Sequence, residues 1–168
     1  MNTSLSAGGD EPVPLTRSEL ARVLVAGVLL PISVVLFMWI VASSWDDLPG
    51  SFPAHWGKDG VDNFVPPQTY INTQACAAGV AALVSTGIAV GNLLSGSWSP
   101  LSRGFTAVAV GVTASIALGF FVQLLRARGL STAEVIDLGG GAGIGGVGGG
   151  FAVFLTVAVL ALPRGEYR

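Results

Sequence analysis

Four segments of this chain, each about 20 residues long, contain no charged side chain. A helix rises 1.5 Å per residue, so about 20 residues cross the ~30 Å hydrocarbon core of a membrane. A chain of 168 residues has little room beyond four such crossings. The segments are Val23–Ala42, Ala75–Leu94, Gly104–Leu125 and Gly143–Leu162. The sequence therefore predicts an all-α integral membrane protein in which four transmembrane helices form a bundle.

Composition agrees with a chain that lies mostly in membrane lipid. Hydrophobic residues make up 51% of the sequence and charged residues only 11%, whereas soluble domains carry about 25% charged residues. The mean hydropathy is +0.69. The net charge of −2, with no basic cluster, argues against nucleic acid as a partner. Cys76 is the only cysteine, so the sequence excludes an intrachain disulfide.

The sequence predicts a polar tail, a membrane domain and a short C-terminal segment. The tail, residues 1–19, is polar and contains Gly, Ser and Pro, so we expect it to be disordered in the cytoplasm. The membrane domain covers residues 20–163, and residues 164–168 form a cytoplasmic C-terminus. The expected spans are 23–42, 70–94, 104–125 and 143–162, with an ordered outer loop at 43–69.

The basic residues indicate how the spans are oriented. Short cytoplasmic loops collect Lys and Arg, and the flanks of the first helix carry the most weight. Five basic residues fall on the side of the termini and three on the other side. They are Arg17, Arg22, Arg103, Arg164 and Arg168 against Lys58, Arg126 and Arg128. We therefore expect both termini in the cytoplasm.

A glycine run precedes the last apolar segment. Nine of the twelve residues in Gly139–Gly150 are glycine. Phe151–Leu162 would form only about 18 Å of helix, which is too short to cross a membrane, so part of the run must lie inside it. The run contains small residues spaced by four, which let helix backbones approach closely. The candidate packing positions are Gly141, Gly145 and Gly149, a second series at Ala142, Gly146 and Gly150, and Gly111, Ser115 and Gly119 in the third span.

Three interpretations of the glycine run remain open. Ordinary packing inside one bundle is favoured, because such small-residue patterns are common in membrane helices. A contact between protomers is the second reading. The third is an unwound stretch near the outer face, which is tolerable where it is buried in protein or lines a cavity.

The loop Ser43–Thr69 is the longest segment between spans, and it holds the only histidine and four acidic residues. Its four prolines restrict the backbone. Lys58-Asp59-Gly60 is a turn signal, because glycine accepts a positive φ. The sequence therefore predicts a compact loop.

The same loop carries a family resemblance. Its pattern is similar to the Leu-Pro-x-x-x-Pro-x-His-Trp/Phe-x-x-x-Gly signature of a bacterial membrane domain of unknown function, which also forms the N-terminal half of SdpI-type immunity proteins. The matching residues are Leu48, Pro49, Pro53, His55, Trp56 and Gly60, followed by Asp62 and Phe64. The resemblance implies a bacterial cell-membrane protein with one helix, an extracytoplasmic loop and further helices. It also implies an immunity or regulatory role.

His55 is the candidate for chemistry in this loop. A neutral imidazole ligates transition metals, and Asp59 or Asp62 could add an oxygen. Three ligands fall short of the four of a closed zinc site, so a structural role in the turn is favoured and neither a metal nor a cofactor is expected. Trp56 would then pack on the membrane surface. A third hypothesis is that His55 senses external pH.

The sequence favours a non-enzymatic function. No nucleophile with an oriented base is recognisable, so we expect no catalytic residue. The spans hold no ionisable group that would mark a proton path. The favoured function is an immunity, regulatory or accessory protein that binds a partner through the outer loop and the small-residue helix faces. The partner could be an extracytoplasmic peptide, a second copy or a larger membrane complex. The alternatives are a component of an oligomeric transporter or channel, and a metal-dependent enzyme centred on His55.

Overall fold

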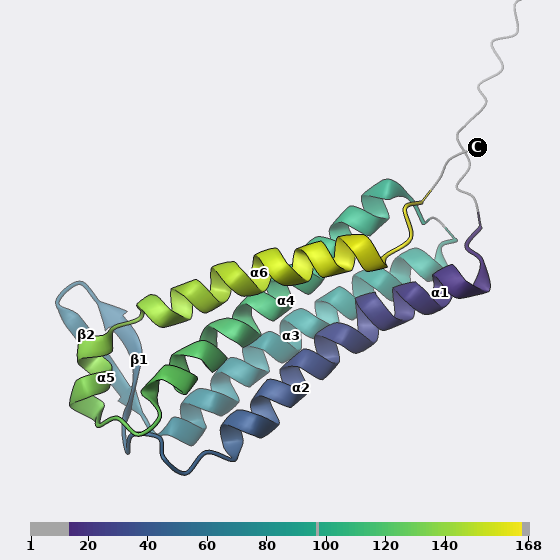
Figure 1. The fold of residues 1–168 in the computed structure, drawn as a ribbon. Helices are drawn as coiled ribbons and strands as arrows, with labels where there is room; N and C mark the ends of the chain where they lie inside the picture. Colours follow the sequence, from purple (N-terminus) through teal and green to yellow (C-terminus); the bar gives the residue numbers. More distant parts are fainter. Residues whose placement is uncertain (1–13, 97, 166–168) are drawn as a thin grey trace, which may run out of the picture.

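The computed structural model describes residues 14–96 and 98–165 and is mostly helical (Figure 1). Four of its helical segments are long and apolar enough to cross a membrane, which confirms that part of the expectation. They lie side by side, with a small two-stranded sheet and a short helix at one end, called the hairpin end here. The four segments are Arg17–Ser43, Pro67–Leu94, Pro100–Ala127 and Gly141–Ala161.

The first segment consists of α1 (Arg17–Leu24), a π-helical turn (η1, Val25–Leu29) and α2 (Leu30–Ser43). A capping box starts α1, in which Thr16 accepts from the Glu19 N–H while the Glu19 carboxylate accepts from the Thr16 N–H. The last residues of the expected tail 1–19 are thus helical, and residues 1–13 lie outside the described part of the chain.

The π-helical turn lies directly before Pro31, which is buried in the bundle. In a regular α-helix the N–H of residue 31 would donate to the Gly27 carbonyl, and proline has no N–H. The Ser85 hydroxyl on the neighbouring helix donates to that carbonyl instead, at 3.4 Å. A β-carbon on Gly27 would lie 2.9 Å from Cβ of Ala89, so the two helices meet closely at this point.

The second and third segments each begin with a proline. Helix α3 spans Pro67–Leu94 and α4 spans Pro100–Ala127. Proline suits the first helical position because the N–H it lacks would have no partner there. The Ser99 hydroxyl caps α4 by accepting from the Ser102 N–H at 3.1 Å. Both helices therefore start a few residues earlier than the expected 70 and 104.

The hairpin end adds strands to the expected all-helical chain. Strands β1 (Phe52–Gly57) and β2 (Gly60–Val65) pair antiparallel within the predicted outer loop. The turn between them lies where the sequence predicted one, and Gly60 has a φ of +117°. A short helix, α5 (Thr132–Leu138), packs against β1. The capping box of Ser131 and Glu134 starts this helix.

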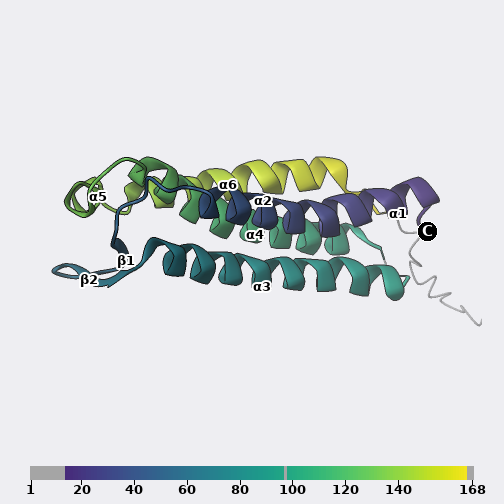
Figure 2. The ribbon, with the colours of Figure 1, turned by 90° about the horizontal axis from the view of Figure 1, so that it is seen from below.

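Helix α4 is the centre of the bundle. Helix α6 (Gly141–Ala161) packs along one side of α4, and α3 lies on the opposite side (Figure 2). Helix α2 packs against both α3 and α4. One hydrophobic cluster lies at the hairpin end, around Phe52, Ile71 and Leu124. A second lies at the other end, around Trp98 and Val110.

The contact between α4 and α6 depends on glycine. A β-carbon on Gly146 would lie 2.6 Å from the Leu118 carbonyl oxygen, and one on Gly150 would lie 2.9 Å from that of Ala114. On the α4 side, a β-carbon on Gly119 would lie 2.6 Å from Cγ2 of Val147. These separations are shorter than real carbon contacts, so only glycine allows the two backbones this close.

The remaining expected packing positions lie in different surroundings. Gly111 faces the Phe151 ring at 3.2 Å from where its β-carbon would be, so it belongs to the same contact. The Ser115 hydroxyl donates to its own helix, at Val112 O (2.7 Å). A β-carbon on any glycine of the first expected series would meet no atom within 4 Å in the described chain. These are Gly141, Gly145 and Gly149. The second series therefore forms the contact within this chain.

Side chains from other helices hold both ends of α6. At its N-terminus, Gln123 Nε2 donates to Gly139 O (3.0 Å), and Gln123 Oε1 accepts from the Gly143 N–H (2.9 Å). At its C-terminus, Arg22 donates to Ala161 O at 2.7 Å, and Arg103 donates to Val159 O. These bonds satisfy terminal backbone groups that a helix cannot pair by itself.

Candidate binding site at the hairpin end

The first half of the loop motif anchors the hairpin. Pro49 and Pro53 are buried, and Leu48 packs against the hydrophobic cluster at this end. Between them, Phe52 is fully buried, and its ring lies 4.5 Å from that of Tyr70 on α3. Burial of a phenylalanine side chain contributes about 1.5–3 kcal/mol. The apolar residues of the motif therefore fix where the strands begin.

The second half of the motif forms an exposed polar pair. His55 Nδ1 lies 2.6 Å from Asp62 Oδ1, and the two side chains are 67% and 56% exposed. Gly57 makes room for this pair, since a β-carbon there would lie 2.7 Å from Asp62 Oδ2. The structure thus brings together the histidine and one of the two aspartates that the sequence put forward as its partners.

The strand register explains how Asp62 reaches the histidine. Trp56 pairs with Val61, and His55 pairs with Asn63, so Asp62 has no partner of its own across the ladder. A second shift beside His55 leaves Ala54 without a partner. Such irregularities redirect side chains, and both unpaired residues line the cavity described next.

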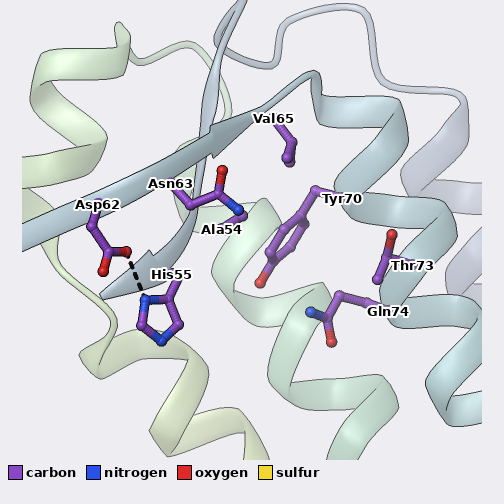
Figure 3. Close-up of a pocket in the computed structure, with 8 residues that line it drawn as sticks. All are labelled: Ala54, His55, Asp62, Asn63, Val65, Tyr70, Thr73 and Gln74. Carbon is purple, nitrogen blue, oxygen red and sulfur yellow. Dashed lines mark hydrogen bonds and ion pairs between the residues drawn. The ribbon is translucent and has the colours of Figure 1, made fainter. Parts of the chain in front are cut away.

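A cavity of about 650 Å³ opens between the hairpin and the start of α3 (Figure 3). His55 and Asp62 border it on the strand side. The side chains of Asn63, Tyr70 and Gln74 point into the same space. No hydrogen bond within the described residues uses these three side chains. The cavity therefore presents amide and phenol groups that are open to a ligand.

A groove of about 360 Å³ lies beside this cavity, along α4, and shares Ala54, Tyr70 and Gln74 with it. Its walls come from α3 and α6, which hardly touch each other in the described chain. Ile116 and Phe120 of α4, with Ile144 and Val147 of α6, make it predominantly apolar. Trp56 lines the groove at the hairpin end, where Trp56 Nε1 would lie 3.8 Å from a β-carbon on Gly140.

Phe64 and Gly60 complete the motif on the outer surface of the hairpin. The Phe64 side chain is 43% exposed, and that of Trp56 is 39% exposed. Exposed aromatic rings of this size are unusual on a soluble surface and common at contact surfaces and membrane interfaces. The expected position of Trp56 on a membrane surface stays a prediction.

An ion pair ties the loop to the end of α4. Arg128 Nε lies 2.9 Å from Asp47 Oδ1, and its guanidinium lies 4.9 Å from the Trp45 ring centre. The hydrogen bonds from Arg128 lower the pKa of the Asp47 carboxyl. The Gly129 N–H also donates to Asp47 O at 2.8 Å. The loop is thus held at its start by Asp47 and further along by Phe52.

The arrangement presents polar groups that can bind a ligand. Across residues 14–96 and 98–165, no group of three His, Cys, Asp or Glu side chains is placed to hold a metal ion. The His55–Asp62 pair resembles the base and orienting group of a hydrolase, and Thr73 is the aliphatic hydroxyl side chain that lines the cavity. The Thr73 hydroxyl donates to Thr69 O at 2.8 Å rather than to the histidine. The pH-sensing role of His55 stays a prediction.

Sequence reasoning missed several lining residues. Tyr70 and Gln74 are one helical turn apart and share a face of α3, which their spacing of four indicates. Both could be read from the sequence only as polar residues near a span end. Asn63 carried no signal, because its position depends on the irregular pairing of the strands. Gln123, which forms hydrogen bonds to the start of α6, likewise carried no signal of this role in the sequence.

The fold and the site together define a helical bundle whose cavity lies beneath a β-hairpin. Comparison with models of known protein families, with curated proteins and with solved structures found no match. The arguments about function therefore rest on the residues and their geometry.

Proposed function

We propose that this chain is a multi-pass protein of the bacterial cell membrane, without enzymatic activity, that binds an extracytoplasmic partner at its hairpin end. The exposed surface of the long helices carries this proposal. Large apolar side chains such as Leu83, Ile144 and Leu160 are 69%, 75% and 73% exposed. Four helices with such surfaces need lipid rather than water around them.

Charge distribution supports an outer location for the hairpin end. Arg128 belongs to the basic residues that oppose this orientation, and Asp47 balances its charge. Arg22 and Arg103 lie at the opposite end, beside the C-terminus of α6. The balance of unpaired basic residues then favours both termini in the cytoplasm.

Sidedness can be tested with single cysteines. In a Cys76→Ser background, Lys58→Cys in the hairpin turn should react with a membrane-impermeant maleimide on intact cells. Arg164→Cys at the other end should react only after permeabilisation. The reverse pattern would contradict the proposed orientation. Release of the protein by carbonate washing would contradict membrane insertion itself.

The free edge of β2 supports an extended peptide as the partner. In the described chain β2 pairs only with β1, so its second edge carries unpaired backbone groups. Such an edge can bind a further strand through main-chain hydrogen bonds. The exposed Phe64 ring on this strand would contact side chains of the added peptide. The resemblance of the loop to immunity proteins agrees with a peptide ligand.

A photo-crosslinking residue at position 64 tests this partner. We expect peptide adducts in intact cells at Phe64 and few at Leu101, which is 65% exposed at the opposite end. An extended peptide should also slow backbone hydrogen exchange across β2. Equal adducts at both positions, or unchanged exchange, would contradict the proposal.

A second binding surface is proposed on α6. Gly141, Gly145 and Gly149 leave one face of this helix open, and glycines at this spacing favour close helix contacts. A second copy or another membrane protein would pack there. Gly145→Leu should then weaken self-association in detergent, whereas an unchanged mass in light scattering would count against it.

The alternative of a transporter component finds less support. Several of the buried hydroxyls that could form a polar path are bonded to backbone carbonyls, whereas the buried Thr86 Oγ1 has no hydrogen-bond partner in the described chain. Thr106 and Thr113 donate to their own helix at 2.8 and 3.0 Å, and Ser85 donates to Gly27 O. Measurable ion flux in liposomes above that of empty vesicles would revive this alternative.

A further inference from the structure

The cavity under the hairpin and the groove along α4 are neighbours that share three lining residues. Ala54 of β1 and Tyr70 and Gln74 of α3 line both parts. The two parts differ in chemistry: the cavity is bordered by amide, phenol and imidazole groups, and the groove by aliphatic and aromatic side chains. A ligand that fills both must itself have a polar and an apolar part.

We propose that the cavity and the neighbouring groove together bind one phospholipid of the outer leaflet, with its head group in the cavity and one acyl chain in the groove. The inference rests on the proposed membrane insertion and goes beyond the proposed peptide partner, which would bind at the free edge of β2.

The polar part supplies donors for the head group. Asn63 and Gln74 carry amide N–H groups, and Tyr70 carries a phenol O–H; none of these is used in a hydrogen bond within the described residues. Phosphate and ester oxygens of a lipid accept such bonds. His55 and Asp62 pair with each other at the rim of the cavity, with Nδ1 and Oδ1 2.6 Å apart.

The apolar groove matches a hydrocarbon chain in chemistry and opens toward the bilayer, from which such a chain would come. Helices α3 and α6 lie on opposite sides of α4 (Figure 2). Residues of all three helices line the groove, and one of them, Ile144, is 75% exposed, so the groove opens on the outer surface of the bundle. Gly119 and Gly143 contribute no side chain to its floor, while Phe120 and Val147 line it. In a membrane this opening faces the bilayer, and a chain can enter without leaving the hydrocarbon region.

The depth of the groove favours a lipid over a peptide there. The groove follows α4 from Gln123 toward Ile116, which is about two helical turns into the apolar part of the bundle. A polypeptide inserted to this depth would place backbone N–H and C=O groups among apolar side chains without partners. A hydrocarbon chain has no such groups.

Photolabelling in vesicles tests the inference. The full chain is reconstituted in phosphatidylethanolamine and phosphatidylglycerol that contain a phosphatidylethanolamine with a diazirine in one acyl chain. We expect label on the α6 residues that line the groove, and Ile144→Trp should fill the groove and lower that label about tenfold, equivalent to about 1.4 kcal/mol of binding. Val153→Trp is the matched control, since Val153 is 58% exposed on α6 but lies outside the groove.

A second arm separates head-group recognition from simple immersion in lipid. Gln74→Leu should lower labelling by the phospholipid and leave labelling by a diazirine-bearing alkane unchanged, while Gln68→Leu on the same helix should change neither. Label spread evenly over all exposed helix faces, or equal effects of Ile144→Trp and Val153→Trp, would overturn the inference. The cysteine test of sidedness reads out membrane insertion independently, so the two failures are distinguishable.

Discussion

The side-chain oxygen of Gln123 on α4 accepts a hydrogen bond from the Gly143 N–H at 2.9 Å, in the first turn of α6. The amide nitrogen of the same side chain donates to Gly139 O at 3.0 Å. Helix α6 has no capping side chain of its own at this end. One glutamine on another helix therefore replaces the usual cap and fixes the position of α6 along α4.

Replacing this glutamine should destabilise the bundle. Gln123→Leu removes both bonds and leaves partly buried backbone groups without partners, which costs about 1–3 kcal/mol. We expect a lower unfolding temperature in mild detergent. Gln68→Leu is the control, because Gln68 is exposed and bonds only to exposed side chains. Equal effects of the two substitutions would show that Gln123 does not act as a cap.

Two adjacent glycines should respond in opposite directions to alanine. A β-carbon at Gly146 would lie 2.6 Å from a backbone oxygen of α4, so Gly146→Ala forces the helices apart and should cost about 1–3 kcal/mol. Gly145 faces open space, and Gly145→Ala should stabilise α6 by about 0.5–1 kcal/mol through helix propensity. Thermal unfolding of both variants in the same detergent makes the comparison. A similar shift in both would contradict the close contact.

The contribution of Ser85 to the free energy of unfolding should fall when Pro31 is replaced. Ser85→Ala leaves the Gly27 carbonyl without its donor, and the expected cost is about 1 kcal/mol. In a Pro31→Ala background the N–H of residue 31 returns and can pair with that carbonyl. A double-mutant cycle on unfolding free energies should therefore give a coupling between positions 31 and 85. Additive effects would mean that the hydroxyl does not serve the carbonyl.

Acid should weaken the tie between the loop and α4. Hydrogen bonds from Arg128 lower the pKa of Asp47 below its ordinary value of 3.8. A carboxyl whose pKa is lower in the folded chain stabilises it above that ordinary value, and the contribution is lost as the pH falls through the lowered pKa. Asp47→Asn should therefore unfold more readily at pH 7 and show a smaller loss of stability toward acid. Solvent exposure of the pair keeps the effect small.

Glu134 gives the matched comparison for that experiment. Hydrogen bonds from the Ser131 N–H and hydroxyl lower its pKa as well, so Glu134→Gln should shift the acid dependence in the same direction. Only Asp47→Asn should also increase proteolysis within the loop, since Glu134 caps α5 and makes no bond to residues 43–69 in the described chain. Equal proteolysis of the two variants would contradict the role of Asp47 as an anchor.

The long helices were predictable because length without charge is a local property of the sequence. The strands were not, since Phe52–Gly57 contains a proline and the unpaired Ala54, and Gly60–Val65 contains the unpaired Asp62, which hide the alternation of a strand. Helix α5 did carry a signal in the sequence, because Ser131 and Glu134 have the spacing of a capping box. Local patterns thus identify elements, while irregular strand pairing conceals them.

The candidate site was predictable only in part. His55 and Trp56 stood out as rare residue types in a restrained loop. Their neighbours Tyr70 and Gln74 come from a different element. Neither segment of the sequence alone predicts how close the two elements lie. The intrachain role of Gly146 rather than Gly145 likewise depends on the rotation of α6 against α4, which a repeat of four leaves undecided.

The central place of α4 has a consequence for biosynthesis. Of the four long helices in the described chain, α4 is the third to leave the ribosome, and α6, which packs mainly against α4, is the fourth. The two earlier long helices are synthesised before α4, their principal neighbour. Helix α6 then docks onto a surface that the first three have already assembled. We expect a nascent chain truncated before Gly141 to keep its first three helices together, with the glycine-lined side of α4 left bare for whatever chaperone or insertase accompanies it.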